Sequence, residues 1–126
     1  MDIVNRNHVE AFVTKDTSTI REILSYRNSQ IRKQSLAEAI VPPGASTQPH
    51  YHRVAEEIYY VLAGQGRIRV EGEEADVAPG DGIAIPPGCV HQIWNTGAED
   101  LVFLCCCAPA YEHSDTELVS VGADAH

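Results

Sequence analysis

Long apolar runs are missing from this sequence of 126 residues. No stretch approaches the roughly 20 apolar residues that a helix needs to cross a bilayer. The first residues, Met1 to Arg6, also lack the basic-then-apolar layout of a secretory signal. From these two absences we expect a cytoplasmic protein and no membrane partner.

Basic residues are scarce as well. The sequence has 9 Lys and Arg against 18 Asp and Glu, so its formal net charge is -9. A surface of that sign repels phosphate backbones and anionic lipids. We therefore expect no nucleic acid partner. A polyanionic substrate would need a metal or a local cation in the site.

The few cysteines form a pattern that argues against disulfides. Of the four, three are adjacent: Cys105, Cys106 and Cys107. A disulfide framework spaces its cysteines apart, so reduced thiols in a reducing compartment are the simpler expectation. Consecutive strand residues point to opposite faces, so the three thiols cannot converge on one metal ion. Their role stays open between small buried hydrophobes and one thiol that reaches a pocket.

Helical periodicity is scarce beyond the N-terminal quarter. There, residues 17–26 fit either a turn of helix or an extended edge strand. Elsewhere, short runs rich in Ile, Val, Tyr and Leu alternate with turn signals built from Gly, Pro and Asn. This pattern predicts an all-β fold, an antiparallel barrel or sandwich. The apolar runs lie at residues 57–62, 67–70, 82–85, 90–94 and 101–107.

The length of the chain predicts a single domain, residues 1–126. We divide it into an N-terminal arm (about 1–33), a barrel (about 34–109) and a C-terminal tail (about 110–126) that frays after Glu117. An arm ahead of a small barrel often pairs with the sheet of a partner subunit and covers its edge. We therefore expect a two-fold homodimer with an arm-to-barrel contact.

One stretch places two histidines and a glutamate together. His50 and His52 are two residues apart, which puts both side chains on the same face of a strand. Glu56 and Glu57 follow across a short loop, and only one of them can point at the histidines. Because Gly64 closes the stretch as a turn, we favour Glu57.

A second stretch supplies a third histidine. His91 comes directly after a Pro-Pro-Gly turn that redirects the chain, so it could return as a fourth ligand. Two or three imidazoles with one carboxylate suit a divalent transition metal: Fe, Mn, Co, Ni, Cu or Zn. In a five- or six-coordinate ion, such a set leaves one or two positions open for a substrate or water.

Together these residues resemble the two motifs of the cupin superfamily. Residues 44–64 match G-x5-H-x-H-x4-E-x6-G, and residues 80–95 match G-x5-P-x-G-x2-H-x3-N, at every defined position. The resemblance covers about residues 36–107, and its four-residue spacing selects Glu57 over Glu56. It implies a jelly-roll β-barrel with one metal in its mouth. By this resemblance the metal ligands are His50, His52, Glu57 and His91.

The resemblance does not select a reaction, because one fold hosts many chemistries. The leading expectation is a metal-dependent enzyme that acts on a small carbonyl, enol or carboxylate substrate, in the manner of a dioxygenase. One alternative is a non-oxidative polyketide cyclase or isomerase. Another is a metal-stabilised module that binds a small molecule without turning it over.

Three more side chains are candidates for the site. Tyr59 shares a strand face with Glu57, so we take both as candidate catalytic residues. Gln48 lies on the face of the first two histidines, and Ile93 shares a face with His91. With Tyr59, these two are the candidate substrate-binding residues.

Overall fold

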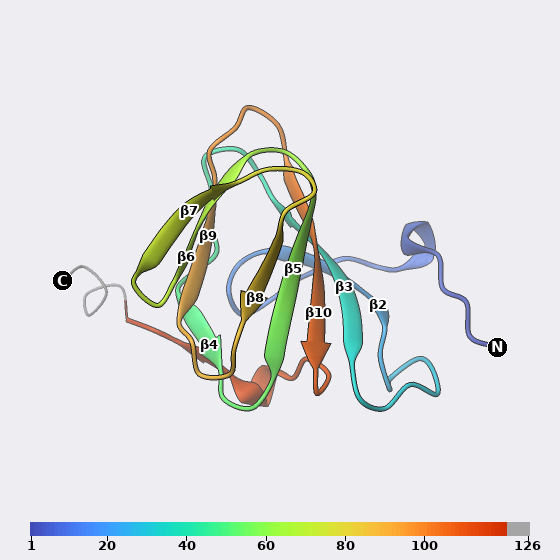
Figure 1. Cartoon of the computed structure of the whole chain (residues 1–126). Coiled ribbons are helices and arrows are strands. Elements are labelled where there is room, and N and C mark those ends of the chain that lie inside the picture. The colour runs from blue at the N-terminus through green and yellow to red at the C-terminus, as the bar shows by residue number, and fades with distance from the viewer. Residues whose placement is uncertain (121–126) are drawn as a thin grey trace.

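The computed structural model describes residues 1–120 and consists of two antiparallel sheets that face each other (Figure 1). The described residues contain no α-helix, only two short 3-10 turns, η1 (Arg6–His8) and η2 (His113–Asp115). No helix among them is long and apolar enough to cross a membrane. The strands are β1 (Phe12–Val13), β2 (Thr19–Leu24), β3 (Ser35–Val41), β4 (His50–His52), β5 (Glu56–Ala63), β6 (Gly66–Val70), β7 (Glu73–Val77), β8 (Gly82–Ile85), β9 (His91–Asn95), β10 (Leu101–Ala108) and β11 (Thr116–Leu118).

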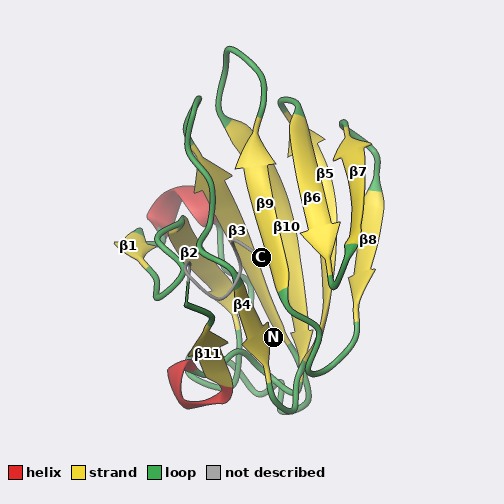
Figure 2. Ribbon diagram, turned by 90° about the vertical axis from the view of Figure 1, so that its left-hand side faces the viewer, coloured by secondary structure: helices red, strands yellow, loops and turns green. Residues whose placement is uncertain are grey.

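The order of the strands confirms the predicted all-β, antiparallel jelly-roll class. One sheet has the order β1-β2-β3-β10-β5-β8, and the other has the order β11-β4-β9-β6-β7. Neighbours such as β3 and β10 lie far apart in the sequence, and every paired strand runs antiparallel. Figure 2 looks onto the face of the sheets, with β4, β9 and β6 in front of β3, β10 and β5.

The N-terminal arm is extended rather than helical where the sequence left both possibilities open. Within residues 17–26, β2 pairs with β3 of the same chain on one side and with the short edge strand β1 on the other. Ile20 lies opposite Ala39 in this pairing and packs against the core. The predicted contact of the arm with a partner subunit stays a prediction.

Strict alternation along β5 decides which side chains face the interior. Glu57, Tyr59 and Val61 are buried, whereas Glu56 and its alternate neighbours are exposed. At the end of this strand the chain reverses at Gly64 with a φ of +91°, a conformation that L side chains rarely adopt. A Cβ there would lie 2.6 Å from the carbonyl oxygen of Asp100, so only glycine fits the turn. The alternation thus sets the inward face of β5 from Glu57 onward, and the turn at Gly64 ends the strand.

The C-terminal segment is more ordered than the predicted frayed tail. Strand β11 pairs with β4 in a register that sets Thr116 opposite His52. Beyond Glu117, Leu118 pairs opposite His50, and the backbone N–H of Val119 donates to the carbonyl of Pro49 at 2.9 Å. The expectation of fraying directly after Glu117 is therefore wrong for these two residues, because they complete the edge of a sheet. Residues 121–126 of the tail lie outside the described part of the chain.

Candidate metal centre

Three histidine side chains converge between the two sheets. In the pairing of β4 with β9, His50 lies directly opposite His91, and His52 follows two residues later on the same face. One ring nitrogen of each histidine lies within 4.8 Å of those of the other two. The exposed fractions are 2%, 4% and 1% for His50, His52 and His91, so water does not solvate this cluster freely.

Each ring is fixed through its Nδ1 atom. His50 Nδ1 lies 2.7 Å from the carbonyl oxygen of Gln48, and His91 Nδ1 lies 2.9 Å from that of Cys89. His52 Nδ1 lies 3.0 Å from Thr116 Oγ1, whose own hydroxyl donates to a backbone carbonyl. All three partners accept, so each ring carries a proton on Nδ1, and for His50 and His91 this is the one proton of the neutral ring. The Nε2 atoms of His50 and His91 are then free to bind a metal, as in metal-binding histidines generally, whereas His52 Nε2 faces the Glu57 carboxylate.

The Nε2 atom of His91 is an orphan. Within residues 1–120 it is the one buried side-chain nitrogen or oxygen that has no hydrogen-bond partner. Leaving such an atom unsatisfied costs about 1–3 kcal/mol, so buried polar atoms are nearly always paired. A metal ion placed among the three Nε2 atoms would satisfy it. The residues present therefore fit a metal.

Glu57 reaches this cluster from the opposite sheet. Its Oε1 lies 3.1 Å from His52 Nε2 and 3.5 Å from His91 Nε2. Its Oε2 accepts a hydrogen bond from Cys107 Sγ at 3.1 Å, since β10 sets Cys107 opposite Glu57. Burial raises the pKa of Glu57, but the hydrogen bond from His52 and the proximity of His91 outweigh it and lower the pKa well below its ordinary value. The side chain is therefore an ionised carboxylate in a buried site.

The histidines differ in their electrostatic surroundings. Burial, together with the charge of His91, lowers the pKa of His50 to about 4, so His50 is neutral at pH 7. Burial also acts to lower the pKa of His52, but the hydrogen bond and charge of Glu57 raise it overall. A neutral ring and an adjacent carboxylate are the forms in which these side chains bind divalent metals.

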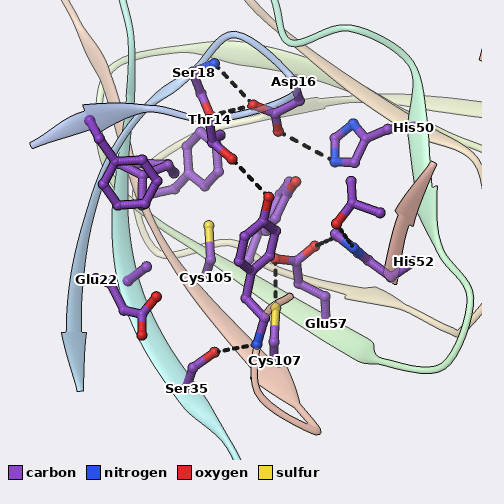
Figure 3. Close-up of a pocket in the computed structure, with 18 residues that line it drawn as sticks. Thr14, Asp16, Ser18, Glu22, Ser35, His50, His52, Glu57, Cys105 and Cys107 are labelled. Atoms are coloured by element: carbon purple, nitrogen blue, oxygen red, sulfur yellow. Dashed lines mark hydrogen bonds and ion pairs between the residues drawn. The ribbon is translucent and has the colours of Figure 1, made fainter. Parts of the chain in front are cut away.

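Asp16 is a site residue that no pattern in the sequence selects. Its Oδ2 lies 3.4 Å from His50 Nε2, and only 9% of the residue is exposed. It comes from the turn between β1 and β2, a segment without a motif. Figure 3 shows Asp16 next to His50, with Glu57 next to His52 on the other side of the group.

A cavity of about 40 Å³ adjoins the histidines and extends along the inner faces of β2, β3 and β10. Of the predicted site residues, His50, His52, Glu57 and Tyr59 line it. Burial raises the pKa of Tyr59 well above its ordinary value, so the phenol keeps its proton. Its ring centroid lies 4.6 Å from that of Phe103 and 5.8 Å from that of His91.

The structure places Gln48 and Ile93 elsewhere. The side chain of Gln48 is exposed and does not line the cavity, although its carbonyl holds His50. Ile93 is fully buried on the same strand face as His91, but it packs in the apolar core instead of lining the cavity. Both remain candidate substrate-binding residues only as predictions.

The thiols divide as the strand pattern predicted. Cys105 and Cys107 face inward and line the cavity, whereas Cys106 is half-buried on the outer face. Burial, followed by the charge of Glu57, raises the pKa of Cys105 and of Cys107 well above the ordinary value. Both are therefore neutral thiols, so neither is a nucleophile at pH 7.

Comparison with known proteins agrees with this geometry. A family model described as "Cupin domain" matches residues 37–107, more than half of the chain. An uncharacterized protein from Methanocaldococcus jannaschii is 47% identical over 111 residues, which cover 88% of this chain and 89% of the relative. An oxalate-binding protein from Thermotoga maritima is 35% identical over 82 residues, with 65% of this chain and 68% of the relative covered.

Among solved structures, the polyketide cyclase RemF from Streptomyces resistomycificus superposes with a TM-score of 0.80. It is 27% identical in sequence, and the match covers 96% of this chain and 87% of the cyclase. The relatives thus include a polyketide cyclase and a protein named for binding oxalate. Neither name by itself assigns a reaction to this chain.

Proposed function

The chain belongs to the cupin family, and from that premise we propose that it is a metal-dependent enzyme acting on a small organic substrate. The proposed ligands of one divalent transition metal per chain are His50, His52, His91 and Glu57. The observation that carries the proposal is the cluster of three Nε2 atoms, whose rings are oriented by their Nδ1 partners and which includes the orphaned atom of His91.

The donor set restricts the metal without identifying it. Three imidazoles and a carboxylate suit Fe, Mn, Co, Ni, Cu or Zn. When bound, such an ion would polarise a carbonyl or enol oxygen of the substrate. The neutral thiols beside it are not part of the proposed ligand set, because the thiol of Cys107 keeps its proton and donates a hydrogen bond to Glu57.

The protein's own groups orient the substrate in this proposal. Glu57 and Tyr59 are the proposed catalytic side chains, since both line the cavity next to the histidines. Tyr59 is held by its contact with Phe103 and keeps its proton, so it can donate a hydrogen bond to a substrate oxygen. The walls of the cavity exclude bulk water, which strengthens each of these interactions.

Two reaction types remain within this proposal, and oxygen uptake distinguishes them. A dioxygenase-like enzyme consumes oxygen with a diketone or enol substrate. A polyketide cyclase or isomerase turns its substrate over in an anaerobic chamber at the same rate. The similarity to a polyketide cyclase structure supports the non-oxidative type.

A binding module without turnover is the second candidate. The cavity supports it, because about 40 Å³ is room for only a few water molecules. The relative named as an oxalate-binding protein supports it as well. Saturable binding of a small ligand to the metal-loaded protein, with no product after prolonged incubation, would favour this candidate over the enzyme.

Metal analysis and a pair of neighbouring variants test the proposal. The purified chain, stripped and reloaded, should bind one equivalent of metal. Glu57→Gln should weaken metal binding by at least about tenfold and abolish turnover, because a ligand and its charge are lost. Glu56→Gln is the matched control, since Glu56 is exposed on the opposite face. Failure to bind any of the six metals at micromolar concentration would contradict the proposal.

A further inference from the structure

We propose that Asp16 determines the specificity of this centre: with it, the cavity takes uncharged, hydroxyl- or carbonyl-bearing ligands and excludes dicarboxylates. The inference rests on the proposed function, because it presupposes a divalent metal on the histidines. It goes further by naming the class of ligand and the residue that selects it.

Asp16 lies as close to the histidine cluster as the proposed ligand Glu57 does. Its Oδ2 lies 3.4 Å from His50 Nε2, within the range of the 3.1 Å and 3.5 Å that separate Glu57 from the other two histidines. Glu57 does not share this position, because its contacts are with His52 and His91. Asp16 therefore brings a second carboxylate to a different part of the cluster (Figure 3).

The carboxylate is held in place by its own turn. Asp16 Oδ1 accepts hydrogen bonds from the backbone N–H of Ser18 at 2.9 Å and from Ser18 Oγ at 2.6 Å. The carbonyl of Asp16 accepts from the N–H of Gln48 at 2.8 Å, which ties the turn to the segment that leads into the first two histidines. One oxygen is thus occupied by Ser18, and the other is directed at His50.

The charge balance of the cavity follows from these contacts. Among the described residues that line it, Asp16, Glu22 and Glu57 carry negative charge, and there is no Lys or Arg. Glu22 forms an ion pair with Arg27 at 2.9 Å, so its negative charge is already balanced. A divalent ion with Glu57 alone would leave a net charge of +1 that attracts anions. Asp16 cancels that charge, so a dianionic ligand would be left without a counter-charge.

Neutral groups supply the rest of the cavity wall. Thr14 Oγ1 and the hydroxyl of Tyr111 lie 2.8 Å apart, and Ser18 and Ser35 add two more hydroxyls. Hydroxyl groups both donate and accept, so they match ligand hydroxyls and carbonyls without requiring charge. Phe103 contributes an apolar surface to the same wall. The lining therefore complements a small uncharged molecule with oxygen substituents.

The test compares oxalate, a dianion at pH 7, with hydroxyacetone, a small molecule that carries one hydroxyl and one carbonyl and is uncharged at pH 7. Both are titrated calorimetrically into protein that has been loaded with Mn²⁺ or Ni²⁺ and checked for metal content. In the Asp16→Asn variant, oxalate should bind at least about tenfold more tightly than in the wild type, because a negative charge near the metal is removed. The affinity for hydroxyacetone should stay within threefold or fall.

A matched control separates the charge of Asp16 from the general effect of removing one negative charge. Asp76→Asn removes the same charge from a side chain that is 85% exposed and lies outside the lining, so oxalate binding should not change. Thermal melts of all variants confirm folding.

The outcomes are distinguishable. If Asp16→Asn binds oxalate no better than the wild type while both carry one metal, the specificity proposal is overturned and the metal site stands. An equal gain in Asp76→Asn would overturn it as well. If the wild type carries no metal, the proposed function itself fails before any ligand is added.

Discussion

Replacement of Thr116 by valine should uncouple His52 from the metal centre. Thr116 is 1% exposed, its Oγ1 lies 3.0 Å from His52 Nδ1, and its hydroxyl donates to the carbonyl of Glu112 at 3.0 Å. Valine has nearly the same shape but can neither accept nor donate. The variant therefore removes the group that keeps the proton of His52 on Nδ1, and it leaves the ring nitrogen buried without a partner.

The size of the effect follows in two steps. Without metal, an unsatisfied buried partner should lower the free energy of unfolding by about 1–3 kcal/mol. With metal, loss of the group that orients a ligand should weaken metal affinity by about 10- to 100-fold. At a metal concentration about 100 times the wild-type Kd, metal stabilises the wild type by about 2.7 kcal/mol. The same concentration should stabilise the Thr116→Val variant by only about 0.4–1.4 kcal/mol.

Urea unfolding with and without metal measures both steps, and competition with a chelator gives the Kd directly. Thr19→Val in β2 is the control, because the side chain of Thr19 makes no hydrogen bond within the described residues. Thr19→Val should leave the stabilisation of the protein by metal unchanged. If Thr116→Val loses stability without metal but gains as much from metal as the wild type, Nδ1 anchoring does not prepare His52, and the reasoning is refuted.

Three other predictions concern the fold and the thiols. Gly64→Ala should destabilise the protein by at least about 1 kcal/mol, because its φ is positive and its Cβ would meet the backbone of Asp100, whereas Gly72→Ala, with open space around it, should change the free energy of unfolding by under about 1 kcal/mol. A thiol reagent should titrate Cys89 and Cys106 in the native protein, and the two inward-facing thiols only after denaturation; four fast-reacting thiols would contradict the described burial. The proposed homodimer should appear at twice the chain mass of 13.8 kDa in light scattering, and a monomer at micromolar concentration would rule it out.

The sequence was most informative where a short-range rule decides the outcome. Alternation along β5 follows from the pleat of a strand, so the sequence alone puts Glu57 and Tyr59 on one face and Glu56 on the other, and the spacing of the motif selects the face of Glu57 as the inward one. The same rule separates Cys105 and Cys107 from Cys106. The fold class was predictable for a related reason, because the spacing of the turns sets the lengths of the strands.

The rule failed where a residue lies outside a strand. Counting back two positions from His50 placed Gln48 on the same face, but β4 begins only at His50, and the intervening Pro49 interrupts the ladder. The chain there is a loop, so the side chain of Gln48 is exposed while its carbonyl turns inward to His50. Periodicity predicts nothing beyond the ends of a strand.

Asp16 and Thr116 could not have been found from the sequence. Each lies more than 30 residues from the histidine of the motif with which it interacts. Their positions depend on which strands the two terminal segments join, and that pairing is settled by tertiary packing rather than by local pattern. Thr116 reaches His52 only because β11 adds to the edge of β4. The contribution of both terminal segments to the site is therefore a result of the structure.

The way the three rings are anchored has a consequence for how this centre can evolve. Gln48 and Cys89 hold His50 and His91 through backbone carbonyls two residues upstream, so almost any side chain at those two positions preserves the anchor. His52 alone depends on a side chain, that of Thr116, from a different segment. Substitutions at positions 48 and 89 therefore leave His50 and His91 anchored, whereas one substitution at Thr116 in β11 changes how His52 is held. The backbone of the barrel fixes the orientation of two ligands, and a side chain of the C-terminal strand β11 sets that of the third.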